Sequence, residues 1–134
     1  MSVTVELQDA LVAHLQAHPD LLPLIGGRVY DNVPASPVFP YVSLGPTDGR
    51  PELLQCLEAR EITCQFDVWT DEQGQLRSCR LITDALARAL RDAEIALEVN
   101  ACVRLEVELV RVLRDPDGVT GHGIVQVTAD TEVA

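Results

Sequence analysis

The spacing of hydrophobic and polar positions changes along the chain, and each spacing predicts a different element. In residues 5–17 leucines recur every four positions, which is typical of an amphipathic helix. In residues 61–69 apolar and polar residues alternate, which indicates a strand with one face in the core. Residues 75–92 return to helical spacing, so we expect a second helix there.

The last third of the chain predicts a long β-hairpin over residues 101–130. Apolar and charged residues alternate before a turn signal at Asp115-Pro116-Asp117-Gly118, and a return strand follows through Ile124, Val125 and Val127. With a further strand at residues 41–45, the elements predict an α+β fold in a single domain, residues 1–134. Its simplest form is an antiparallel β-sheet of about four strands with two main helices packed on one face.

The connection between the first helix and the sheet is rich in proline and glycine. Pro34, Pro37 and Pro40 exclude a helix and favour a stiff, extended approach to the first strand. Residues 45–60 are too many for a tight hairpin and contain the turn signal Asp48-Gly49. We therefore expect a long loop at 45–60, of the kind that is often functional or mobile.

The net charge of −11 narrows the classes of partner. Ordinary DNA binding places Lys and Arg on phosphates, and this chain has no basic run for that purpose. Its acidity favours solubility through self-repulsion, and it would also suit a surface that faces nucleic acid without retaining it. Four arginines fall on the second predicted helix, where they either pair with acidic groups of a neighbouring subunit or solvate the helix.

Hydropathy and the charges near the start of the chain indicate a cytoplasmic protein, and the cysteine spacing argues against a metal or redox site. No apolar run approaches the roughly eighteen residues that cross a bilayer, and Glu6 and Asp9 stand where a signal peptide would carry Lys or Arg. The four cysteines include no C-x-x-C pair, so we interpret them mainly as small buried hydrophobic residues rather than as a zinc or redox site.

The sequence shows no combination of residues that indicates catalysis. Glu106 and Glu108 are spaced for a carboxylate pair, but a solvated or subunit-facing strand surface explains them better. The Asp115 turn lacks the glycine and the glutamate that a calcium loop requires. Phosphate-binding glycine motifs and a nucleophile elbow are also absent from the sequence. We therefore expect no enzymatic activity, no metal and no cofactor.

Several segments together resemble the tail-completion, or tail-terminator, family of long-tailed bacteriophages and phage-like gene transfer agents. They are the N-terminal helix with its leucine-rich turn, GGRVYDNVP, FPYVSLG, EITCQFDVWTD, the arginine-bearing helix with LITDALARAL, and VRVLRDPDGVTGHGIVQV. The resemblance spans nearly the whole chain. It implies a structural virion protein that forms a homo-hexameric ring on the head-proximal end of the tail tube, stops tube polymerisation and joins the tail to the head stopper or connector protein.

The resemblance also implies a location and a set of contacts. Assembly would take place in the host bacterial cytoplasm, and the ring would end at the head–tail junction of a virion or gene transfer agent particle. Double-stranded DNA would pass through its lumen without specific binding, and no membrane would be involved. Candidate contacts with the neighbouring subunit or the tail-tube protein are Arg28, Tyr30, Asp31, Asp48, Gly49, Arg50, Pro51, Glu52, Trp69, Arg77, Arg80 and Arg88.

A different class of function stays open from the residues alone. A small α+β ligand-binding domain or a regulatory adaptor would have a similar pattern of helices and strands. Such a domain would need a pocket with convergent polar groups, and the sequence does not indicate one.

Overall fold

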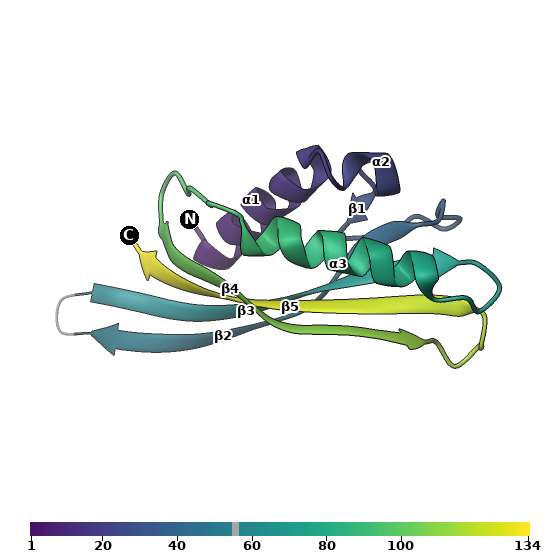
Figure 1. The fold of residues 1–134 in the computed structure, drawn as a ribbon. Coiled ribbons are helices and arrows are strands. Elements are labelled where there is room, and N and C mark those ends of the chain that lie inside the picture. The colour runs from purple at the N-terminus through teal and green to yellow at the C-terminus, as the bar shows by residue number, and fades with distance from the viewer. Residues whose placement is uncertain (55–56) are drawn as a thin grey trace.

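The computed structural model of the chain describes residues 1–54 and 57–134 and shows one layer of helices on one β-sheet (Figure 1). Within these residues the elements are α1 (Val3–Ala17), α2 (Leu22–Ile25), β1 (Val29–Tyr30), β2 (Tyr41–Leu54), β3 (Leu57–Asp71), α3 (Arg77–Arg91), β4 (Ala101–Arg114) and β5 (Thr120–Val133). Both long helices lie on the same side of the sheet, which confirms the predicted α+β architecture.

The sheet has five strands in the described part of the chain, rather than the expected four or so. Their order is β1-β2-β3-β5-β4, and every neighbouring pair is antiparallel except β1 with β2. The additional strand, β1, is only Val29 and Tyr30, which pair in parallel with Val42 and Ser43. So short a strand leaves no periodic signal in the sequence.

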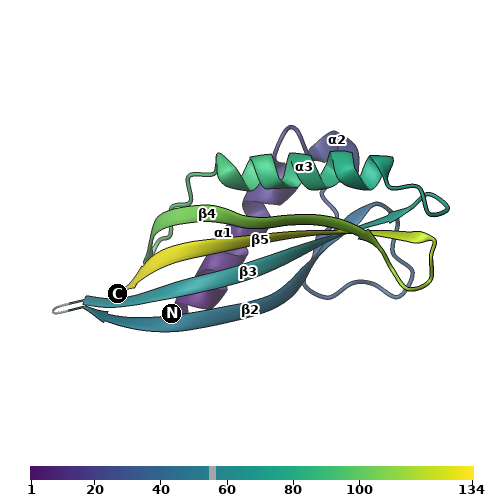
Figure 2. The ribbon, with the colours of Figure 1, turned by 60° about the horizontal axis from the view of Figure 1, so that its bottom comes forward.

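The prediction of a long loop over residues 45–60 is wrong. Strand β2 continues to Leu54 and β3 begins at Leu57, while Gln55 and Cys56 lie outside the described residues. The two strands pair in register almost throughout, and their paired ends extend beyond the helices in both Figure 1 and Figure 2. The segment is therefore a projecting hairpin.

The turn-like residues of β2 are accommodated by its position at the edge of the sheet. A register shift between Leu44 and Thr47 absorbs Gly45-Pro46 as a bulge. Beyond Ser43 no strand of the described chain pairs with the outer side of β2, so Pro51 can lack its N–H without removing a hydrogen bond between strands. Pairing with β3 thus overrides the local turn signals.

The core lies between the helices and the inner face of the sheet. Leu7, Leu11 and Leu15 of α1 are fully buried, as their spacing predicted. Helix α3 contributes a second row of buried side chains, and the sheet contributes the residues opposite them, with Phe66 the largest. Burial of these side chains supplies the main stabilisation of both helices.

Strand β5 allows α3 to lie close to the sheet because it carries glycine at two inward-facing positions. A Cβ atom at Gly121 would overlap Thr70 Oγ1, and one at Gly123 would overlap Thr83 Oγ1 on α3. The Cβ at Gly123 would also lie 3.1 Å from Val68 Cβ. His122, between them, belongs to the opposite face of the strand.

Glu6 joins α1 to the start of β4 and to both chain ends. Its carboxylate is 8% exposed and accepts the backbone N–H groups of Val99 and Asn100, each at 2.9 Å. The Asn100 side chain also donates to the carbonyl of Met1 at 3.3 Å and accepts the N–H of Ala134 at 2.9 Å. Hydrogen bonds from Asn100 first, and then from Val99, hold the pKa of Glu6 below its ordinary value of 4.5.

A Glu6→Gln variant should therefore show a stability deficit that depends on pH. A carboxyl group whose pKa is lowered by folding stabilises the folded state above its unfolded pKa, and this contribution is lost as the pH falls through its folded pKa. We expect the wild-type protein to be the more stable above about pH 5, with the difference shrinking below pH 4.5. Urea unfolding of both proteins across this pH range measures the difference in their free energies of unfolding.

The matched control for Glu6→Gln is Asp9→Asn, which removes one carboxylate from an exposed position of the same helix. A deficit of equal size in the control would show that the loss of negative charge, and not the loss of the hydrogen bonds from residues 99 and 100, causes the effect.

Candidate interaction surfaces

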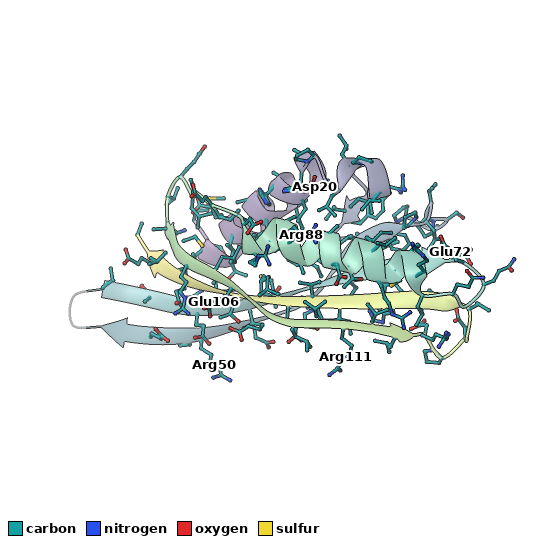
Figure 3. All side chains as sticks on the ribbon, in the orientation of Figure 1. Asp20, Arg50, Glu72, Arg88, Glu106 and Arg111 are labelled. Atoms are coloured by element: carbon teal, nitrogen blue, oxygen red, sulfur yellow. The ribbon has the colours of Figure 1, made fainter. Side chains whose placement is uncertain are left out.

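The sheet face turned away from the helices, here called the open face, is lined by polar side chains. Its central rows are the cross-strand pairs of β3 and β5, and Figure 3 shows Arg50 and Arg111 pointing away from the sheet on this side. The central rows are Glu61 with Asp130, Thr63 with Thr128, Gln65 with Gln126, Asp67 with Ile124 and Trp69 with His122. Because the helices cover only the inner face, these residues form an extended polar surface.

A hydrogen-bonded network fixes one end of the open face. The Trp69 ring stacks on His122 with centroids 4.0 Å apart, and its Nε1 donates to Ser43 Oγ at 2.9 Å. His122 Nε2 lies 2.7 Å from Asp67 Oδ1, which also accepts from Gln65 Nε2 at 3.0 Å. Trp69 therefore packs on the sheet itself, and the network holds its indole in one orientation.

The other end of the open face contains a shallow hollow of about 600 Å³, here called the open-face hollow. Its lining includes three carboxylates and one guanidinium, so its formal charge is negative. The lining residues are Asp48, Gly49, Arg50, Glu61, Thr63, Glu108, Gln126 and Thr128. Glu108 reaches it from a bulged position of β4, where the register with β5 shifts between Val107 and Leu109.

Helix α3 carries a row of exposed residues, here called the α3 arginine stripe, on the helix side of the molecule. Spacings of three and four positions place them along one side of the helix, and Arg88 among them is labelled in Figure 3. The stripe consists of Arg77, Arg80, Leu81, Asp84, Arg88 and Arg91, with a formal charge of +3. Leu81 within it is 55% exposed.

The predicted stiff segment after the first helix lies along the β1 edge of the sheet. Arg28 Nε donates to the Pro40 carbonyl at 2.9 Å, which ties the start of the segment to its end. The Tyr41 ring lies 5.9 Å from Tyr30 and 5.1 Å from Phe39, between ring centroids. These aromatic residues thus pack on one another at the point where the chain enters β2.

The structure distributes the predicted contact residues over separate surfaces. Arg28, Tyr30 and Asp31 lie at the β1 edge, and Trp69 lies in the open-face network. Residues 48–50 line the open-face hollow, and Pro51 and Glu52 follow on the exposed hairpin. Arg77, Arg80 and Arg88 belong to the α3 arginine stripe.

Sequence reasoning missed the residues that complete these surfaces. Glu61 and His122 were visible only as polar positions in a strand, and Glu108 was expected on a solvated or subunit-facing strand surface, but the neighbours of all three depend on the register between β3, β5 and β4. Glu106, considered earlier as part of a carboxylate pair, forms an ion pair with Arg104. This contact fits the strand-surface interpretation.

The cysteines within the described residues are packing groups with weakly nucleophilic thiols. Burial raises the pKa of Cys64 to about 11, and burial also raises the pKa of Cys79 and of Cys102. In residues 1–54 and 57–134, no group of three or more His, Cys, Asp or Glu side chains is placed to hold a metal ion. Among the described helices, none has the length and apolar character needed to cross a membrane.

Comparison with known proteins assigns the chain to a family. The family model for tail completion protein gp17 matches residues 9–132. The chain belongs to this family. A curated relative, tail completion protein gp17 of Bacillus phage SPP1, is 29% identical over 124 residues, which are 90% of this chain and 88% of the relative. The resemblance seen in the sequence motifs is thereby confirmed.

Two solved structures share the fold. A chain from the virion of a native gene transfer agent particle aligns with a TM-score of 0.89 at 26% identity, over 98% of both chains. The structure of bacteriophage SPP1 gp17 protein aligns with a TM-score of 0.60 at 25% identity, over 94% of this chain and 88% of that one. The expectation of a structural tail protein is thus supported at the level of the family.

Proposed function

We propose that this protein is a tail terminator that forms a homo-hexameric ring on the head-proximal end of the tail tube. There it stops tube polymerisation and joins the tail to the stopper or connector protein of the head. The observation that carries the proposal is the alignment of 98% of the chain, at a TM-score of 0.89, with a chain of a gene transfer agent virion. In this role residues 1–134 act as one structural domain without enzymatic activity.

The negative net charge of the chain suits a ring through which DNA passes. The chain carries 21 acidic and 10 basic residues, so a lumen lined by its average surface would repel phosphates. At physiological salt this repulsion acts over about 8 Å, which is enough to discourage contact with the wall of a channel. Double-stranded DNA would then pass without specific binding.

The β2–β3 hairpin is the element best placed to reach the tail-tube protein. It extends beyond the helices, and Asp48, Arg50 and Glu52 on it are exposed. We assign its outer part, with Pro51, Glu52 and Glu58, to contacts with the tube, and Arg28, Tyr30 and Asp31 at the β1 edge to an additional contact between subunits. Assembly takes place in the host bacterial cytoplasm, and the finished ring lies at the head–tail junction of the phage or gene transfer agent particle.

Native mass spectrometry and negative-stain imaging of the purified protein test the ring. We expect a hexamer with an open centre, either for the protein alone or after addition of tail-tube protein. In the mixture, growth of the tubes should stop at a capped end. A protein that stays monomeric in both samples and leaves tube growth unchanged would contradict the proposal.

A hairpin variant tests the assignment of the tube contact. Glu52→Gln with Glu58→Gln should leave the fold intact and reduce capping of tubes by roughly tenfold or more, because charges at an interface steer association. The matched control is Asp20→Asn with Glu72→Gln, two exposed positions that Figure 3 shows far from the hairpin. Equal capping by both variants would exclude the hairpin as the tube contact.

A further inference from the structure

We propose that copies of this chain join head to tail, with the α3 arginine stripe of one copy seated in the open-face hollow of the next. The inference rests on the proposed ring and names the two surfaces that close it. The partner is therefore a second copy of the same chain, recognised through complementary charge.

The two surfaces have the relative placement that a head-to-tail contact requires. Helix α3 covers the inner face of the sheet, whereas the hollow opens on the other face (Figures 1 and 3). A contact between two different patches on opposite sides of a subunit can repeat from copy to copy, and it closes into a ring if the rotation per step allows. A contact of one patch with itself would stop at a dimer.

Charge makes these surfaces complementary in a protein that is otherwise self-repelling. The stripe holds four of the chain's ten basic residues, and the hollow presents the carboxylates of Asp48, Glu61 and Glu108 beside a single arginine, Arg50. With a net charge of −11, most other pairs of surfaces would bring like charges together. Arginine suits such a contact, because its planar fork can bind a carboxylate through two hydrogen bonds.

Among the described residues, most charged groups of the two surfaces form no ion pair within the subunit, although Arg91 of the stripe pairs with Asp92, and Arg50 lies across from Glu61 in the hollow. In the described part of the chain, Arg77, Arg80 and Arg88 form no ion pair, and the same holds for the three carboxylates of the hollow. Glu61 also lies directly across from Asp130 in the sheet, a like-charge pair that costs stability and that Arg50 on β2 and Arg104 on β4 flank. A guanidinium from the next copy would offset this repulsion.

The stripe also offers an apolar centre for the contact. Leu81 is exposed among the arginines, and the hollow, at about 600 Å³, has room for several side chains. Its lining includes the short side chains of Thr63 and Thr128, which leave space for a protruding leucine. An apolar centre with a charged rim is the usual composition of a specific protein interface.

A single side-chain amine, identified by the peptide that carries it, maps the contact directly. All ten basic residues of the chain are arginines, so the variant Arg88→Lys carries a single side-chain amine. A zero-length carbodiimide reagent should join this amine to Glu61 or Glu108, and mixing chains of two isotopic labels shows whether the link lies between copies. The control, Arg28→Lys, places the amine at the β1 edge and should give no link to the hollow.

Charge reversal tests the same contact energetically. Arg88→Glu and Glu61→Arg should each raise the concentration needed for half-assembly by about tenfold or more, because each brings like charges together. The two changes in one chain should restore assembly to within about threefold of wild type, as expected for a directly coupled pair. Circular dichroism checks that each variant folds.

The outcomes separate this inference from the proposed function. Links from Arg88→Lys to the hollow, together with rescue by the double reversal, support the contact. A hexameric ring whose links fall elsewhere, or which the reversals leave intact, overturns the contact and leaves the proposed function standing. Absence of any ring, with or without tail-tube protein, overturns both.

Discussion

Replacing Leu86 with alanine is expected to lower the free energy of unfolding by about 3 kcal/mol. Leu86 is fully buried on the inner side of α3 and belongs to the cluster that joins this helix to the sheet. Truncation removes apolar surface from the core and leaves a cavity, because the long strands of the sheet cannot collapse around it. Urea unfolding followed by circular dichroism measures the loss.

The matched control is the same substitution on the other side of the same helix. In the monomer, at protein concentrations below assembly, Leu81→Ala should change the free energy of unfolding by no more than about 0.5 kcal/mol, since the Leu81 side chain is largely exposed. Helix propensity changes alike in both variants, so the difference between them reports burial alone. Equal losses at the two positions would show that α3 does not pack with its Leu86 side on the sheet.

Replacing Gly123 with alanine is expected to cost about 2 kcal/mol by overpacking. The added methyl group would overlap Thr83 Oγ1 and press on Val68, so α3 would have to move away from the sheet. Gly49→Ala is the control in another strand of the sheet, β2, because the nearest atoms to its added Cβ would belong to the flexible Arg60 side chain, at 3.4 Å. Thermal or urea unfolding should show a clear loss only at position 123.

A double variant tests the cause of the Gly123 effect. Thr83→Ala removes the hydroxyl that the new methyl group would overlap, so Thr83→Ala with Gly123→Ala should be less destabilised than the sum of the single variants. Strict additivity would mean that close packing against Thr83 is not what requires glycine at this position.

Local periodicity was sufficient to predict the helices and the longest alternating strands. The helix predicted at 5–17 is α1, and the helix predicted within 75–92 is α3. The turn of the C-terminal hairpin was also predicted, and Asp117 accepts the backbone N–H groups of Val119 and Thr120 there, each at 2.9 Å. These elements satisfy their own hydrogen bonds or bury one face, so short windows of sequence contain their signal.

Features that depend on partners distant in the sequence were missed. The outer half of β2 contains Asp48-Gly49 and Pro51, and only its pairing with β3 makes it a strand. The bulge in β4 near Val103 exposes this valine, although it continues the alternation of Leu105 and Val107. Tertiary contacts decide where these strands continue and where they bulge, and they override local propensity.

The candidate interaction residues were predicted one segment at a time, and the surfaces that they form were not. The arginine positions of α3 follow from the helical period, so the α3 arginine stripe could be anticipated. The open-face hollow could not, because Asp48, Glu61 and Glu108 come from three strands whose relative register includes bulges. A one-residue change of register would move any of these carboxylates to the other face.

The Gly121-His122-Gly123 sequence of β5 places two unrelated selection pressures on adjacent codons. The glycines are constrained by the distance between helix and sheet, and the histidine is constrained by its stack with Trp69 on the open face. In an alignment of relatives, position 122 should therefore covary with position 69, and positions 121 and 123 with positions 70 and 83. Evolution can thus remodel the outer surface of this strand without disturbing the packing beneath it.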